Sequence, residues 1–119
     1  MTRIALLCPD LLFGSKVEGG LRAAGHEVER HSGEDAARAA AAQSDLLIVD
    51  LTSEEVDGPV LVDSMRKKGE LGALPTLGFY SHVDVDMRRR AEEAGFDQVV
   101  PRSRMARDMA GLVEGMLQP

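Results

Sequence analysis

Three nearly continuous apolar runs stand out in the sequence, at 4–7 (Ile-Ala-Leu-Leu), 45–49 (Asp-Leu-Leu-Ile-Val) and 76–80 (Thr-Leu-Gly-Phe-Tyr). Runs of this kind are typical of parallel strands that are covered by helices on both faces. Two further segments, 26–30 and 97–100, carry charged or polar residues and predict edge strands. The three apolar runs should therefore form the centre of a five-stranded sheet.

Helix-like segments alternate with these runs. We expect helices at about Leu12–Ala24, Glu34–Ala42, Gly58–Lys68, Val85–Ala94 and Arg104–Leu117. Such alternation predicts an α/β protein, and right-handed crossovers leave few strand orders for it. We therefore predict a single domain over residues 1–119, with a flavodoxin-like, doubly wound, five-stranded parallel sheet of order 2-1-3-4-5.

Short signals predict how individual helices end and pack. Gly25 and Gly95 follow Ala-rich turns, where a left-handed residue ends a helix, and Ser32 with Asp35 has the spacing of a capping box for the second helix. In the last helix, apolar residues at helical spacing predict a stripe that faces the core. These residues are Met105, Met109, Leu112, Val113 and Met116.

Composition and charge narrow the classes of function. The 119-residue chain has a formal net charge of -6, which argues against neutralising nucleic-acid phosphates as its task. No apolar run approaches the roughly 20 residues of a membrane-spanning helix, so we expect no membrane insertion. The single cysteine, Cys8, cannot form an intrachain disulfide, which favours a cytoplasmic location. Gly14-Ser15-Lys16 lacks the spacing of a phosphate-binding loop, and we expect no cofactor.

Polar residues gather where the strands should end, the edge at which doubly wound sheets bind ligands. The candidates for a pocket there are Asp10, Lys16, Tyr80, Ser81, His82, Arg102 and Ser103. Cations, hydroxyls and helix N-termini at this edge could surround a small anion. Alternatively, Ser81 and Ser103 are helix N-caps while Lys16 and Arg102 are solvated. The spacing does not favour a nucleophilic triad, and we do not expect an enzyme.

Several segments, in order and over essentially the whole chain, resemble the receiver domain of two-component response regulators. The stretch 45–51 is similar to the family's third strand, which ends in a phosphate-accepting aspartate, here Asp50. Asp57-Gly58 stands where the family opens its next helix, Pro75 begins the fourth strand, and 90–97 resembles the stretch that leads into the fifth. The resemblance implies a signalling domain whose chemistry uses Mg²⁺ and a lysine.

The residues that this chemistry needs are mostly replaced. Cys8 and Pro9 stand where the resemblance places an acidic pair, and only Asp10, one position later, is acidic. A thiol and an imino acid make a poor magnesium site. Tyr80, followed by Ser81, stands at the switch Ser/Thr, and Arg102-Ser103 stands at the Lys-Pro pair. The chain therefore resembles a degenerate receiver, a pseudo-receiver without a bound metal.

Asp50 leaves two interpretations open. In the first it is a leftover carboxylate that pairs with Arg102 or caps the 52–55 loop. In the second it is a residual phosphoacceptor, with Arg102 as counter-ion and Asp10 or Glu54 helping to hold a metal.

The basic run Arg88-Arg89-Arg90 is either a solvated helix face, paired with Glu92 and Glu93, or a docking surface. The resemblance favours docking, because receivers commonly bind through the fourth helix, fifth strand and fifth helix. We therefore expect a stand-alone, non-enzymatic module in two-component signalling that acts by protein-protein interaction, with another protein or a second copy as partner. The alternatives are a phospho-accepting response regulator at Asp50 and an anion- or small-molecule-sensing domain.

Overall fold

The inner strands of the sheet are the three apolar runs. In a computed structural model, which describes residues 2–118, every residue of β3 (Leu46–Asp50) and β4 (Thr76–Tyr80) is buried, as is all of β1 (Arg3–Leu7) except its first residue. The half-polar strands β2 (Glu27–His31) and β5 (Gln98–Pro101) lie at the edges. The strand order is β2-β1-β3-β4-β5, so the predicted flavodoxin-like topology is confirmed.

All four strand pairs are parallel, which aligns the carboxyl ends of the strands at one edge. Leu7 pairs with Val49, Asp50 pairs with Phe79, and Tyr80 pairs with Pro101. The residues that follow these positions therefore meet at a single edge of the sheet, although they are far apart in the sequence.

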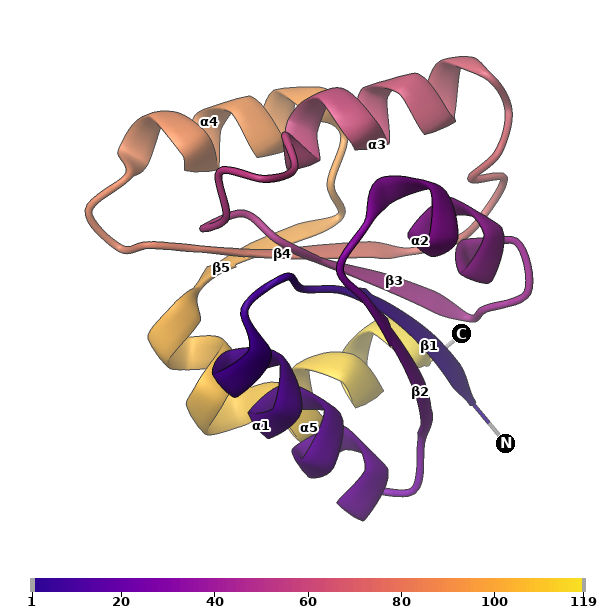
Figure 1. Ribbon diagram of the computed structural model, residues 1–119, viewed down its shortest axis with the longest axis vertical. Helices are drawn as coiled ribbons and strands as arrows, with labels where there is room; N and C mark the ends of the chain where they lie inside the picture. The colour runs from indigo at the N-terminus through magenta and orange to yellow at the C-terminus, as the bar shows by residue number, and fades with distance from the viewer. Residues whose placement is uncertain (1, 119) are drawn as a thin grey trace.

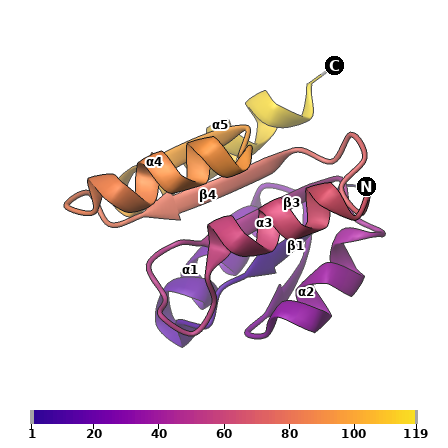
Figure 2. The same cartoon turned by 90° about the horizontal axis from the view of Figure 1, so that it is seen from above.

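Two layers of helices cover the sheet (Figure 1). Helices α1 (Leu11–Ala23) and α5 (Arg102–Leu117) pack on one face, and α2 (Glu34–Ala41), α3 (Gly58–Lys67) and α4 (Val85–Ala94) pack on the other, as the second view also shows (Figure 2). The stripe on α5 is part of the core as predicted, because Met105, Met109, Leu112 and Val113 are buried and Met116 packs against them. None of the helices within residues 2–118 is long and apolar enough to span a bilayer.

Helix ends agree with the sequence only in part. Gly25 and Gly95 adopt the predicted left-handed conformation, with φ of 96° and 102°. The predicted capping box at Ser32 is wrong, because the N-cap of α2 is Gly33 and no side chain caps it. The helix begins one residue later than the box requires, which leaves Ser32 outside the helix. Glu34 and Asp35 instead place negative charge in the first turn, where the helix dipole favours it.

Candidate functional site

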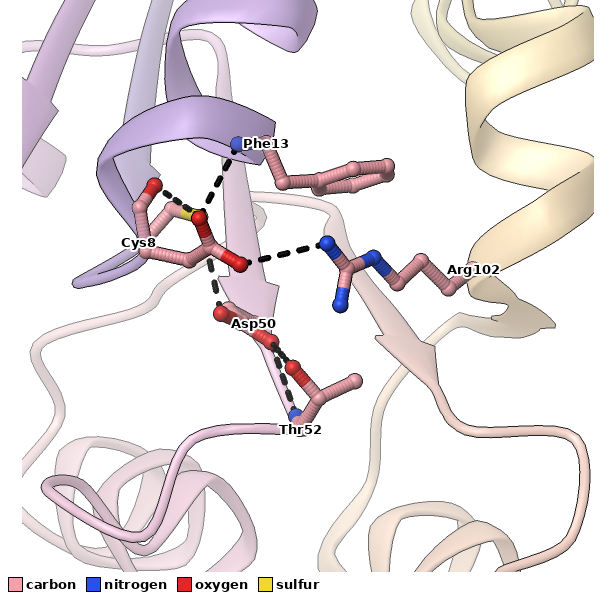
Figure 3. Close-up of polar contacts among 6 residues, drawn as sticks. Cys8, Phe13, Asp50, Thr52 and Arg102 are labelled. Carbon is pink, nitrogen blue, oxygen red and sulfur yellow. Dashed lines mark hydrogen bonds and ion pairs between the residues drawn. The ribbon is translucent and has the colours of Figure 1, made fainter.

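The candidate site lies at the carboxyl edge of the sheet, where residues that follow β1 and end β3 meet the starts of α1 and α5. Figure 3 shows the polar contacts there among Cys8, Phe13, Asp50, Thr52 and Arg102. Because parallel strands deliver these residues to one edge, side chains from positions 8 to 102 form a single cluster.

Asp50 ends β3 and is only 1% exposed. Its Oδ1 accepts hydrogen bonds from the backbone N–H of Thr52 at 2.8 Å and from the Thr52 hydroxyl at 2.6 Å. Its Oδ2 accepts a hydrogen bond from the Cys8 thiol at 3.5 Å. Both oxygens of this buried carboxylate are thus bonded to donors of the chain itself, and none of the described residues 2–118 supplies it with a cationic partner.

Cys8 is buried directly beside Asp50. Burial, and after it the adjacent Asp50 charge, raise the pKa of the Cys8 thiol from 9.0 to about 12. The group is therefore a protonated thiol at neutral pH, and its single proton lies within reach of Asp50 Oδ2 at 3.5 Å and of the Asp10 carbonyl oxygen at 3.6 Å. A protonated thiol is a poor ligand for Mg²⁺ and a poor nucleophile.

Asp10 caps α1 and holds Arg102. Its Oδ1 accepts from the backbone N–H of Phe13 at 3.0 Å, and its Oδ2 accepts from Arg102 Nη2 at 3.1 Å. The hydrogen bond from Phe13 and then the Arg102 charge lower the pKa of the Asp10 carboxyl, although burial opposes them. The guanidinium carbon of Arg102 also lies 4.2 Å from the centre of the Phe13 ring, a cation–π arrangement. Arg102 is therefore held from two sides by α1.

The pairing of Arg102 corrects one sequence-based interpretation. The first interpretation of Asp50 pairs it with Arg102, but the ion pair of Arg102 is with Asp10. Thr52 already occupies Oδ1 of Asp50, whereas the cap of α1 leaves Oδ2 of Asp10 free to receive the guanidinium. The other part of that interpretation is confirmed, because Asp50 caps the loop through Thr52.

These donors do not fit a magnesium site of the kind that the receiver resemblance implies. Mg²⁺ requires several oxygen ligands in near-octahedral geometry. At this edge Asp50 is occupied by Thr52 and Cys8, Pro9 offers no side-chain ligand, and Asp10 is occupied by Arg102. In the part of the chain that the structure describes, no three His, Cys, Asp or Glu side chains are placed to share a metal ion.

A pocket of about 360 Å³ opens beside this cluster. It is lined by Phe13, Thr52, Ser81, His82, Arg102, Ser103 and Ala106. This lining includes four of the pocket residues expected from the sequence, namely Ser81, His82, Arg102 and Ser103. Thr52 adds a hydroxyl group and Phe13 adds an aromatic ring. A pocket of about 400 Å³ lies near the opposite edge and is lined partly by Arg3, Arg22 and His26. In that second pocket, Arg22 donates a hydrogen bond to the backbone oxygen of Val28. We assign the candidate site to the carboxyl edge because the polar cluster lies at that edge.

Three of the expected pocket residues lie outside its lining. Tyr80 is buried in the core beneath α3 and α4, because alternation along β4 turns it to the face opposite Phe79. Lys16 lies on the exposed side of α1, whose inward positions are Phe13, Val17 and Leu21. Asp10 reaches the pocket only through its ion pair with Arg102.

The expected N-caps at Ser81 and Ser103 are wrong. Asp84 caps α4 by accepting from the N–H of Met87, and Ser81 lies before the turn that precedes this helix. Helix α5 begins one residue before Ser103, and its N-cap, Pro101, offers no side-chain hydrogen bond. The start of α5 therefore has no side-chain cap, in contrast to α1, α3 and α4, which Asp10, Asp57 and Asp84 cap.

The arginine run on α4 is engaged in ion pairs. Arg88 faces Glu92 at 3.7 Å, and Arg89 pairs with Asp86 at 3.0 Å. Arg90 donates to both carboxylate oxygens of Asp57, at 2.9 and 2.8 Å, and so ties α4 to the start of α3. Arg90 thus has an internal structural contact, whatever the other two arginines bind.

Sequence reasoning missed the role of Phe13, the hydrogen bond from the Thr52 hydroxyl to Asp50, and the contact between Cys8 and Asp50. The Asp50-x-Thr52 spacing was a usable signal, because an Asp side chain commonly accepts from the backbone two residues later. The placement of Phe13 beneath Arg102 had no such signal, since it depends on how α1 and α5 pack side by side.

Comparisons with known proteins bear on the fold. No protein-family model matches the sequence, and no similar sequence was found among curated proteins. Among solved structures, the chain is similar to chemotaxis protein CheY4 of Vibrio cholerae, with a TM-score of 0.84, 18% identity, and coverage of 98% of this chain and 99% of that one. A putative response regulator from Chloroflexus aurantiacus gives 0.86 and 23%, with coverage of 98% and 97%.

A third structure is the receiver domain of sensor histidine kinase PA1611 from Pseudomonas aeruginosa, which has a magnesium ion in its active-site cleft. Its TM-score is 0.84 at 15% identity, with 98% of this chain and 97% of that chain covered. Matches at this level of identity establish the architecture. The chain therefore has the fold of response-regulator receiver domains.

Proposed function

We propose that this protein is an atypical, receiver-like signalling module that acts by binding another protein and does not depend on Mg²⁺-assisted phosphorylation of Asp50. The main support for the proposal is that the charged groups of the site already have hydrogen-bond or ion-pair partners within the chain. Both Asp50 oxygens accept from Thr52 and Cys8, and the nearby cation Arg102 is held by Asp10.

Electrostatics gives the physical reason. Phosphoryl transfer to a carboxylate needs cations that neutralise the charge on the moving group. A metal at Asp50 would have to displace hydrogen bonds at a side chain that is 1% exposed, and Arg102 would have to leave both Asp10 and the Phe13 ring. Each step loses contacts that the folded chain already makes, so phosphorylation is opposed at both the metal and the counter-ion.

The Asp10–Arg102 pair supports a module whose conformation is fixed without phosphate. A phosphoryl group on Asp50 would need Arg102 as its cationic partner, and Arg102 is already paired with the Asp10 carboxylate. The pair joins the start of α1 to the start of α5 and spans 92 residues of sequence. A constant surface of this kind suits recognition of a partner better than a switch driven by phosphorylation.

The test is exposure to acetyl phosphate with Mg²⁺, followed by intact-mass spectrometry, with a phospho-accepting receiver domain as positive control. We expect no phosphoryl adduct on the native chain. The matched variant Cys8→Asp/Pro9→Asp/Arg102→Lys restores the acidic pair and the lysine, and any adduct it gains should disappear when Asp50→Asn is added. An adduct on the native chain that Asp50→Asn removes would favour the alternative, a phospho-accepting regulator.

The pocket favours a second candidate function, an anion- or small-molecule-sensing domain. Its lining contains Arg102, His82 and three hydroxyl side chains but no carboxylate. A thermal-shift screen with phosphate, sulfate and small carboxylates tests this. The sensing function is supported only by a saturable stabilisation that Arg102→Ala abolishes and that Lys67→Ala, at a distant exposed site, retains.

A further inference from the structure

The exposed apolar side chains gather at one end of the molecule. Among residues 2–118, the large apolar side chains that are mostly exposed are Leu11, Leu12, Val60, Val83 and Val85, at 65%, 84%, 60%, 74% and 67%. All five lie in, or directly before, the first turns of α1, α3 and α4. Figure 1 shows these three helix starts at the same end of the sheet, the carboxyl edge that carries the candidate site.

This distribution is not that of an ordinary surface. Single exposed apolar residues are common and scattered, whereas several gathered at one place mark an interaction surface. The opposite end of α3 carries Arg66, Lys67, Lys68 and Glu70, which are all exposed. The apolar exposure is therefore confined to the end that surrounds the pocket.

The charged groups near these exposed apolar side chains indicate what kind of ligand could bind there. The pocket lies between Phe13 of α1 and Ser81 and His82, which precede α4, and no carboxylate lines it. Arg102, which lines it, pairs with Asp10 through Nη2, while its Nε and Nη1 form no hydrogen bond with residues 2–118. The adjoining start of α5 lacks a side-chain cap, so its N–H groups and dipole favour negative charge. Lys16, one helical turn after Leu12, is exposed and forms no ion pair with residues 2–118. Together these groups favour a carboxylate beside apolar side chains.

Acidic residues at the same end argue against a membrane or a nucleic acid as the occupant. Glu54, Glu55, Asp84 and Asp86 are exposed around the starts of α3 and α4. They repel an extended anionic surface, and the chain as a whole has a formal charge of -6. A single carboxylate on a peptide can enter the pocket between these residues, whereas a continuous array of phosphates cannot avoid them.

We infer that this end of the molecule, defined by Leu11, Leu12, Lys16, Val83 and the Arg102 pocket, docks an acidic amphipathic segment of a partner protein. A carboxylate of that segment lies against Arg102 and the start of α5, and its apolar side chains cover Leu12 and Val83. A second acidic group faces Lys16. The inference rests on the proposed function and specifies where the partner binds and what chemistry the partner presents.

The test uses a phage-displayed library of random peptides, selected against the immobilised full chain without Mg²⁺ or a phosphodonor. We expect enrichment of peptides that combine Asp or Glu with Leu, Ile or Phe. The strongest binder is then synthesised and titrated into the native chain and three variants. Leu12→Ser and Lys16→Glu should each weaken binding by about tenfold or more, whereas the matched charge reversal Lys67→Glu at the far end should change it by less than about twofold. Thermal unfolding checks that all three variants remain folded.

Several results would overturn this docking surface. They are the absence of enrichment, enrichment of basic peptides, or affinities that Leu12→Ser and Lys16→Glu leave unchanged. Tighter binding to phosphatidylglycerol vesicles than to the peptide would show a lipid occupant, and a dimer in solution that Leu12→Ser dissociates would show a second copy of the chain.

A parallel selection with Mg²⁺ and acetyl phosphate separates this inference from the proposed function. Acidic peptides that bind the Leu12 surface only after that treatment would support the docking surface and refute phosphorylation-independent action. Failure of both selections, with no phosphoryl adduct on Asp50, would refute the docking surface alone.

Discussion

Replacing Thr52 by Val tests directly whether Asp50 is held by internal donors. The change removes the hydroxyl that donates to Asp50 Oδ1 at 2.6 Å but retains the branched shape of a half-buried side chain. A hydrogen bond to a charged group contributes about 1.5–3 kcal/mol. Because the Thr52 N–H and the Cys8 thiol still donate to Asp50, we expect a loss near the lower end, about 1.5–2 kcal/mol.

Urea unfolding and calorimetry measure this loss. For a chain of 119 residues it corresponds to a fall in Tm of roughly 6–8 °C. The matched control is Ser53→Ala in the same loop, whose hydroxyl accepts only from the backbone N–H of Glu55 at an exposed position. We expect that control to cost less than about 0.5 kcal/mol.

A double-mutant cycle with Asp50→Asn isolates the contribution of the charge. A neutral partner makes a weaker hydrogen bond, so Thr52→Val should cost about 1 kcal/mol less in the Asp50→Asn background. A loss below about 0.5 kcal/mol in the native background, or equal losses in both backgrounds, would show that Thr52 does not stabilise a charged Asp50. The Thr52 hydroxyl would then not be satisfying a buried carboxylate.

Three further predictions concern the same edge and its support. With the pKa of Cys8 raised to about 12, the folded chain keeps a proton that the unfolded chain loses above pH 9.0. The free energy of unfolding, measured by urea unfolding, should therefore fall by about 1.4 kcal/mol per pH unit above that value. Cys8→Ala should remove this slope. The pKa of Asp10 is lowered by the amide it caps and by Arg102, so its stabilising effect is present above the ordinary value of 3.8 and is lost on acidification; the stability difference between the native chain and Asp10→Asn should therefore shrink as the pH falls below that value. In Gly78→Ala, the new Cβ would lie 2.6 Å from Leu51 Cδ1 in the core, and urea unfolding should show a loss of about 1–3 kcal/mol.

The architecture could be predicted because its signals are local. Continuous apolar runs distinguish β1, β3 and β4 from the half-polar edge strands, and parallel alternation leaves few topologies. Asp50 could be placed for the same reason, since it follows directly after such a run. Local capping was less predictable, because a shift of one residue in the start of α2 or α5 changes whether Ser32 or Ser103 can reach a helix N-terminus.

The hydrogen bonds and ion pairs within the site could not be predicted from the spacing of residues in the sequence. The partner of Arg102 depends on which carboxylate still has a free oxygen, and this is decided by Thr52 at Asp50 and by the α1 cap at Asp10. The outward direction of Lys16 depends on the helix phase relative to the sheet. Both features depend on the tertiary structure, in which side chains compete for the same partners.

An Mg²⁺ titration followed by NMR at the backbone amide of Thr52, which donates to Asp50, measures whether Asp50 can bind the metal. If the internal donors occupy the carboxylate as described, millimolar Mg²⁺ should produce no saturable change in that resonance, and Asp50→Asn should respond in the same way. A saturable shift of the Thr52 amide at low-millimolar Mg²⁺ that Asp50→Asn abolishes would show that Asp50 binds the metal despite its internal donors.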